Sequence, residues 1–389
     1  MKKGISVIIP CYYSWEYTEE CLNSVFQQRN VDTQVICVYN ERDNFLPLLK
    51  ELKKLQNGHK ITLVDNSGTN YGAAFARNCG LQYADKDTVM FIDDDDIIGW
   101  KPGSSNIDPY YLEYFYYVLS QDNKLAMVTG DVIASNDGIE KTSFKNYSGL
   151  PRKRKIQIEH ALPFLDERNT SCATLYRTSI INDNDLRFKP NMKYREDTEF
   201  IMQYALAAAM THKHALTPVK WPESNDGLDS YYWYRKHPDS VMGQAMYNSQ
   251  LRWHNEYKRQ KDNLAYRTYL LQVIENHPLR EKLLPTYNKM ISGWKHTQKS
   301  IQNDIDNMVN AGRDIVNWYK TLQQFDSPDE TKIPDISKTY LQLFYNPISR
   351  ETIERLKQLQ KQEVSHNKTE QLKTVLCMHN IPGLFKERT

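Results

Sequence analysis

Short apolar runs alternate with segments of helical periodicity along the first hundred residues of the chain. The runs are rich in β-branched residues, which is typical of strands buried on both faces of a parallel sheet. The segments between them carry apolar residues three and four positions apart, the spacing of an amphipathic helix. The pattern predicts strands at residues 5–9, 34–39, 61–64 and 89–92, and helices at residues 18–28, 45–55 and 73–84.

This alternation predicts an α/β fold with a doubly wound, largely parallel, Rossmann-like sheet. Pro10 is expected to end the first strand, and Thr18 to cap the first helix. In such sheets ligands bind beyond the carboxyl ends of the strands. The residues expected at those ends are Pro10 to Tyr12, Asn40, residues 65–70 and the aspartates at 93–96.

The pattern loosens after residue 100 and becomes helical from about residue 250. We expect a helix at 108–119, a strand at 126–131, an irregular insertion at 139–163, a helix at 197–210 and a strand at 231–234. Apolar positions at heptad spacing over 284–322, and a similar stripe before His277-Pro278, need a helical partner. A helical hairpin or a self-associating coil, and hence a homo-oligomer through the C-terminal helices, would supply it. The predicted domains are 1–245, catalytic, and 246–389, helical, for packing, oligomerisation or acceptor binding.

The two regions differ in net charge, and the cysteine pattern of the whole chain indicates a compartment. Residues 1–245 carry 28 Lys and Arg against 32 Asp and Glu, a net charge of −4, whereas residues 246–389 carry the other 22 against 16, a net charge of +6. The six cysteines include no C-x-x-C pair, and no run of 18 apolar residues occurs. We therefore expect no transmembrane segment and a cytoplasmic location, with peripheral contact at the inner face of a membrane left open.

Four consecutive aspartates interrupt the apolar stretch "VMFIDDDDIIG" at residues 89–99. Adjacent carboxylates repel one another and are costly to bury without a counter-charge. In an extended chain Asp93 and Asp95 would share one face and could present two oxygens to Mg²⁺ or Mn²⁺. An exposed acidic turn, or acids at the start of a helix, is the alternative. The position directly after a buried strand favours a cation site that also binds a diphosphate.

Four motifs together resemble the family-2 glycosyltransferases of GT-A fold. They are "SVIIPCYYSWEYTEECLNSVFQQ", "NYGAAFARNCGLQYA", "FIDDDD" and "REDTEF", and the resemblance covers roughly residues 4–245. It implies a metal-dependent, inverting transfer of a sugar from a nucleotide-sugar, a UDP-sugar above all, to an acceptor hydroxyl. The reaction is a single displacement that needs no enzyme nucleophile.

The resemblance also implies roles for individual residues. Asp197 matches the catalytic base, with Glu196 beside it towards the acceptor, although Asp197 could equally be an acid at a helix start. Asp95 and His237 match metal contacts, while an exposed loop position is the alternative for His237. The donor-binding matches are Pro10, Tyr12, Asn70, Arg77, Asp93 and Asp94 of the D-x-D region, Arg235 and Ser240.

One departure from the family pattern concerns the nucleobase. The family commonly has "VDDGS" after the second strand, where this chain has "VYNER", so Tyr39 replaces the aspartate that reads uracil. Asn40 or Asp65 would have to substitute for it.

The acceptor is the part that the sequence leaves open. Arg152, Lys153 and Arg154 are either a solvated loop or an attraction for an anionic acceptor. That acceptor could be a phosphate polymer, an acidic surface glycan, a lipid diphosphate, or DNA with hydroxymethylated bases, as for viral enzymes. A non-catalytic assembly subunit is the third reading, and the intact D-x-D acids and Asp197 argue against it.

Overall fold

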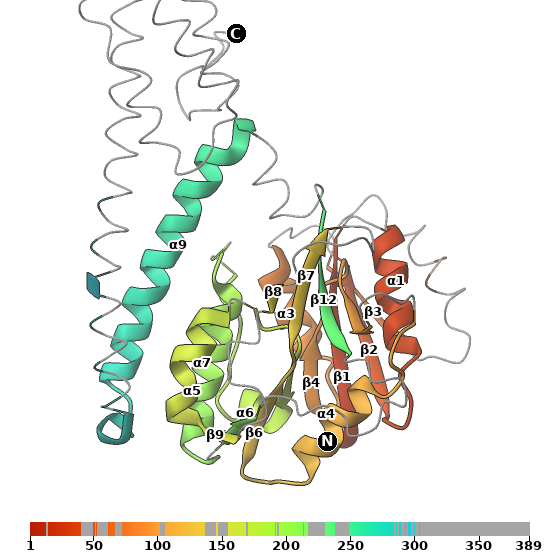
Figure 1. Cartoon of the computed structure of the whole chain (residues 1–389), viewed down its shortest axis with the longest axis horizontal. Coiled ribbons are helices and arrows are strands. Elements are labelled where there is room, and N and C mark those ends of the chain that lie inside the picture. The colour runs from red at the N-terminus through yellow and green to blue at the C-terminus, as the bar shows by residue number, and fades with distance from the viewer. Residues whose placement is uncertain are drawn as a thin grey trace, which may run out of the picture. The chain divides into compact units, whose positions relative to one another are not determined.

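The computed structural model describes most of the N-terminal part of the chain and one long helix after it (Figure 1). The described residues are 1–12, 15–39, 61–66, 72–101, 106–136, 145–146, 155–168, 170–190, 194–212, 214–216, 230–237 and 249–283, with a few single positions outside these ranges. Among the helices of these residues, none is both long and apolar enough to cross a bilayer.

The core of the fold is a mixed sheet in the order β3-β2-β1-β4-β10-β6-β11-β9. β10 runs antiparallel to β4 and β6, and β9 antiparallel to β11, while the remaining pairs are parallel. The predicted α/β fold with a mostly parallel sheet is therefore confirmed. The strands are β1 (Lys2–Cys11), β2 (Thr33–Tyr39), β3 (Ile61–Asp65), β4 (Lys86–Phe91), β6 (Leu125–Thr129), β9 (Lys155–Gln157), β10 (Thr174–Arg177) and β11 (His214–Leu216).

A smaller sheet, in the order β5-β12-β7-β8, accompanies the main one. Its strands are β5 (Ile97–Trp100), β12 (Tyr231–Lys236), β7 (Val132–Asn136) and β8 (Lys145–Asn146). Trp100 and Trp233 stack with ring centroids 4.8 Å apart, and Ile97 and Ile133 complete their apolar cluster. This cluster fixes β12 beside β5, the strand that directly follows the aspartates.

Several of the described helices pack on strands. The described helices are α1 (Trp15–Phe26), α3 (Gly72–Leu81), α4 (Tyr111–Ser120), α5 (Ile158–Arg168), α6 (Thr178–Asp183), α7 (Glu196–Ala209) and α9 (Ser249–Glu275). Helix α3 packs on β1 and β2, and α5 lies beside α7 (Figure 1). A Cβ at Gly80 would collide with the Ile8 side chain, so glycine lets α3 approach β1 closely.

Three sequence predictions are wrong in detail. Pro10 does not end the first strand, because β1 continues to Cys11 beside Tyr39 of β2. The Ile92 N–H donates to the Ile8 carbonyl, at the end of the pairing between β1 and β4. Residue 10 faces the same side as residue 8, but pairing with β4 has stopped there. The missing N–H of Pro10 therefore costs no sheet hydrogen bond. Thr18 is no N-cap, because α1 begins at Trp15.

The third error concerns the expected irregular insertion at 139–163. It contains β9 and the first half of α5, which runs through Pro163. These pieces are too short, or too interrupted by proline, to show a clear period in the sequence. The helix at 45–55, apart from two single positions, and most of the heptad stripe at 284–322 lie outside the described residues.

The chain divides into two compact units. The first is Met1–His237 together with Tyr269–Ile291, and the second is Pro238–Thr268 together with Ser292–Thr389. The expected break at His277-Pro278 is confirmed, since α9 ends at Glu275. The domain boundary between residues 245 and 246 stays a prediction.

Candidate active site

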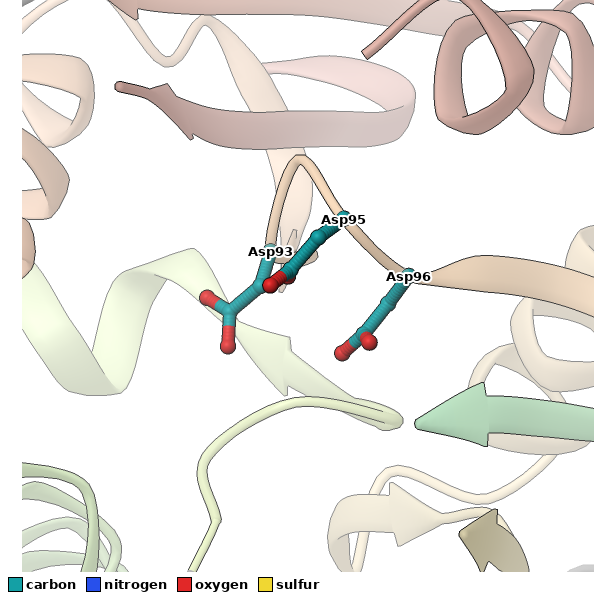
Figure 2. A group of neighbouring side chains, drawn as sticks. All are labelled: Asp93, Asp95 and Asp96. Atoms are coloured by element: carbon teal, nitrogen blue, oxygen red, sulfur yellow. The ribbon is translucent and has the colours of Figure 1, made fainter. Parts of the chain in front are cut away.

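The aspartates at 93–96, hereafter the acidic turn, lie at the carboxyl end of β4. The Asp96 N–H donates to the Asp93 carbonyl at 3.1 Å, which closes a turn before β5 begins at Ile97. Carboxylate oxygens of Asp93, Asp95 and Asp96 lie within 4.8 Å of one another. Figure 2 shows the three side chains projecting from the same side of the turn. Asp93 and Asp95 do lie together, but through a turn that also brings in Asp96, not through an extended strand.

Asp94 is directed to a different set of partners. Its Oδ2 accepts from the Tyr12 N–H at 2.9 Å and from the Thr18 hydroxyl at 3.1 Å. Burial, and then the charge of Asp95, raise the pKa of Asp94 to about 7, against the opposing effect of the Tyr12 N–H. Asp94 thus ties the acidic turn to the end of β1 and to α1.

Asp96 ties the acidic turn to β12. This fully buried side chain accepts from the Tyr232 hydroxyl at 2.6 Å and from the Arg235 N–H at 2.9 Å. The Asp93 N–H in turn donates to the Tyr232 oxygen at 3.2 Å. Burial, followed by the charges of Asp95 and Asp93, raises the pKa of Asp96 well above its ordinary value.

Two basic side chains, Arg235 in β12 and His237 directly after it, lie near the acidic turn. His237 Nε2 lies 3.0 Å from Asp95 Oδ2, and the His237 ring centroid lies 4.4 Å from that of Tyr17. The Arg235 guanidinium is paired with Glu20 and lies over the rings of Tyr17 and Trp233, 4.6 and 4.9 Å from their centroids.

Arg77 on α3 joins the acidic turn to the start of α7. Its side chain is only 2% exposed. Nη2 lies 2.6 Å from Asp93 Oδ1, and Nη1 lies 3.1 Å from Asp197 Oδ1 and 3.5 Å from Glu196 Oε1. Burial lowers the pKa of Arg77, but the carboxylates of Asp197 and Asp93 outweigh burial and raise it. Part of the counter-charge that the aspartates need is therefore supplied by the chain itself.

Glu196 and Asp197 are the first two residues of α7, and their carboxylates lie in different surroundings. Arg195 precedes them in the left-handed conformation, with φ of 68°, which turns the chain sharply into the helix. Burial, and then the charge of Asp197, raise the pKa of Glu196 to about 8. Burial also raises the pKa of Asp197, but Arg77 opposes this and the Ser171 hydroxyl donates to Oδ1 at 2.6 Å. At neutral pH we assign the proton to Glu196 and the charge to Asp197.

The structure brings most of the described candidate residues to one edge of the sheet. The Arg77 guanidinium contacts carboxylates, and its expected role in binding the donor stays a prediction. Pro10 is buried in β1, Tyr12 is 48% exposed, and Asp65 is exposed at the end of β3, where the Asn66 N–H donates to the Tyr39 carbonyl at 2.9 Å. Asn40, Asn70, Ser240, Arg152, Lys153 and Arg154 lie outside the described residues.

Four residues of the site were not assigned a role from the sequence: Glu20, Ser171, Tyr232 and Asp96. Their contacts join positions up to 215 residues apart, as between Arg235 and Glu20. Only Asp96 carried a signal, as the last of four adjacent acids.

The acidic turn has the donor chemistry of a divalent-cation site. Asp93 and Asp95 keep 30% and 21% of their side chains exposed, whereas both oxygens of Asp96 are used by Tyr232 and Arg235. Hard cations such as Mg²⁺ and Mn²⁺ prefer carboxylate oxygens, and imidazole suits Mn²⁺ less than carboxylate does. The residues fit such an ion, with Asp95 and Asp93 as its holders and His237 at hand.

Comparison with known proteins identifies relatives of the chain. Residues 6–185 match the family model described as glycosyl transferase family 2. The poly(ribitol-phosphate) beta-glucosyltransferase of Bacillus spizizenii is 24% identical over 208 residues, which are 52% of this chain and 30% of that protein. The poly(ribitol-phosphate) beta-N-acetylglucosaminyltransferase TarS of Staphylococcus aureus is 28% identical over 209 residues, 52% of this chain and 32% of TarS. The chain thus spans about a third of the length of these relatives.

A solved structure shows the same fold. The crystal structure of S. aureus TarS 1–349 in complex with UDP-GlcNAc aligns with a TM-score of 0.51 and 18% sequence identity, covering 74% of this chain and 71% of that one. The matched family region contains Arg77 and the acidic turn and ends before Asp197.

Proposed function

The chain carries a family-2 glycosyltransferase domain of GT-A fold, and on this premise we propose that it transfers a sugar from a UDP-sugar, with inversion, to a hydroxyl of an anionic phosphate polymer of the teichoic-acid type. The observation that carries the proposal is the Arg77 bridge. One buried guanidinium contacts both Asp93 of the acidic turn and Asp197 at the start of α7. The cation side and the base side of the reaction are therefore built as one charged cluster.

The donor end of the site uses the acidic turn. Asp95 and Asp93 would hold a divalent cation, which when bound stabilises the charge that develops on the leaving diphosphate. The hydrogen bond from the Tyr12 N–H to Asp94 holds the end of β1 at the acidic turn. Asp65 at the end of β3 is our candidate for contact with the uracil. His237 beside Asp95 would close over the diphosphate from β12.

The acceptor end uses the first turn of α7. Asp197 would remove the proton of the attacking hydroxyl, because Arg77 and Ser171 stabilise its ionised form. Glu196 would face the acceptor as a carboxylic acid at neutral pH, since its pKa is raised to about 8. Direct attack from the side opposite the diphosphate inverts the anomeric centre.

The choice of acceptor rests on the relatives. Both curated relatives are named for poly(ribitol phosphate). Arg152, Lys153 and Arg154 are our candidates for binding the phosphates of such a polymer. A DNA acceptor and a non-catalytic role gain no support from these names. The five described cysteines are free thiols, which agrees with a cytoplasmic, reducing compartment.

The test is UDP release from UDP-glucose and UDP-GlcNAc with Mn²⁺, with and without poly(ribitol phosphate). We expect the polymer to accelerate release, and Asp197→Asn to lower kcat by roughly 10²- to 10⁴-fold, the range of general-base catalysis. Asp185→Asn is the matched control, because Asp185 is an 86% exposed acid that pairs only with the exposed Arg187 among the described contacts. Full activity of Asp197→Asn would contradict the assigned base. Acceleration by duplex DNA with hydroxymethylated bases, and not by the polymer, would contradict the acceptor.

A further inference from the structure

Residues that follow the last strand of the catalytic fold return to contact α7. The segment Tyr269–Ile291 belongs to the same compact unit as Met1–His237. It contributes buried apolar side chains, namely Leu270, Leu271, Ile274 and Leu283. Two polar side chains of the segment, those of Tyr269 and His277, are directed at opposite ends of α7 through the contacts described below.

Tyr269 acts at the first turn of α7 through an ion pair. Glu199, two residues after Asp197, is fully buried, and a buried carboxylate is costly without a partner. Lys189 provides that partner, with Nζ 2.9 Å from Glu199 Oε1. The same ammonium lies 2.9 Å from the centroid of the Tyr269 ring. The ring therefore holds the cation that neutralises Glu199.

The segment that carries Lys189 is also fixed to the helix that carries Arg77. Asn78 binds Phe188 twice, accepting from its N–H at 2.8 Å and donating to its carbonyl at 2.7 Å. The Phe188 ring stacks on Phe200 of α7 at 4.0 Å and lies 5.3 Å from the Arg77 guanidinium. Movement of Lys189 would thus be felt by both α3 and α7.

His277 acts at the last turn of α7. The Leu279 N–H donates to His277 Nδ1 at 3.1 Å, which makes Nε2 the ring atom that carries the proton. Nε2 then donates to the Leu206 carbonyl at 3.1 Å. The Met210 N–H is directed at Ala207 and Ala208, so the Leu206 carbonyl is one of the helix-end acceptors that need an outside donor.

We propose that Tyr269 and His277 are positioning residues of the proposed transferase, which hold α7 at both ends and so fix Asp197 against Arg77. The inference rests on the proposed function for its kinetic consequence only. Its structural consequence, the rigidity of the first turn of α7, can be measured without any substrate.

The experiment compares Tyr269→Leu with Tyr269→Phe in the full chain. We expect Tyr269→Leu to speed amide hydrogen exchange over the first turns of α7 by roughly three- to tenfold, and to lower kcat by a similar factor with the donor KM unchanged. Tyr269→Phe should restore both, because the ring face and not the hydroxyl holds Lys189. Tyr117→Leu, at a 54% exposed tyrosine on α4, is the matched control.

Several results would overturn the proposal. Wild-type exchange in Tyr269→Leu would do so, as would equal damage by Tyr269→Phe. If Tyr269→Leu fails to fold, Tyr269→Met takes its place with the same expectations. If the wild type shows no transferase activity, the proposed function fails, while the exchange data still decide whether this segment holds α7.

Discussion

Arg77 is a buried cation shared by three carboxylates of the candidate site. It is 2% exposed and contacts Asp93, Asp197 and Glu196. A buried carboxylate that loses its cation keeps its desolvation cost and gains nothing in return. The arginine fork can contact two carboxylates at once, whereas an ammonium is a single point charge.

We therefore predict a strong and pH-dependent effect of Arg77→Met. The free energy of unfolding should fall by about 3–5 kcal/mol, measured by chemical denaturation. The loss should be larger at pH 8 than at pH 5. Without the cation the pKa values of Asp197 and Glu196 rise further above their unfolded values, so stability is lost as pH rises through them.

Two further variants make this prediction specific. Arg77→Lys should cost less stability than Arg77→Met because the charge remains, yet it should still lose activity because the bridge is broken. Arg187→Met is the control, since Arg187 is 40% exposed and its partner Asp185 is 86% exposed. A loss at Arg77 no larger than that at Arg187 would contradict the bridge.

At this scale the sequence predicted acids better than their partners. Asp93, Asp95 and Asp197 stand in short motifs, so their neighbours in the chain identify them. Tyr232 and Ser171 act through hydrogen bonds to Asp96 and Asp197 that close only when distant segments fold together. No local pattern encodes such contacts.

Strand β12 is the element that connects the acidic turn with its basic partners. The turn bonds to β12 through Tyr232 and the Arg235 N–H, and β12 ends where His237 meets Asp95. The stacked Trp100 and Trp233 hold the strand beside β5. A change in the register of β12 would move His237 away from Asp95.

We predict that Tyr232→Phe weakens this connection. It removes the donor to Asp96 Oδ2 and the acceptor of the Asp93 N–H, and leaves both groups buried or partly buried without that partner. The cost should be about 1–3 kcal/mol of unfolding free energy. The affinity for Mn²⁺, followed by titration, should also fall because Asp93 and Asp95 are held less firmly. Tyr83→Phe, at a 50% exposed tyrosine, is the control, and an equal effect there would refute the role of the Tyr232 hydroxyl.

Strands that form long apolar runs and helices with a clear period were predicted, whereas the short antiparallel strands β9 and β10 were not. The strands β1, β2, β3 and β4 are continuous apolar runs, and α3 and α7 have helical spacing. In contrast β10 has four residues between β4 and β6, and β9 has three. Such strands are specified by the neighbours they pair with, which lie far away in the chain.

At the scale of the whole molecule, the domain boundary predicted between residues 245 and 246 and the division of the structure do not fall at the same place. The helical pattern starts at about residue 250, whereas the first compact unit contains Tyr269–Ile291 in addition to Met1–His237. A periodicity shows that a segment is helical and has an apolar face. It does not show which surface that face covers.

The division leads to a prediction about two shortened chains, one ending at Ile291 and one ending at residue 245. The longer one keeps Tyr269, His277 and the buried Leu270 and Ile274, and should melt within a few degrees of the full chain. The shorter one loses the contact of Tyr269 with Lys189, the hydrogen bond of His277 to the Leu206 carbonyl, and the buried Leu270 and Ile274. A loss of a few kcal/mol in a chain of this size corresponds to about 5–10 °C in Tm. Calorimetry of both chains checks this, and equal melting temperatures for the two would show that α7 needs no support from beyond residue 245.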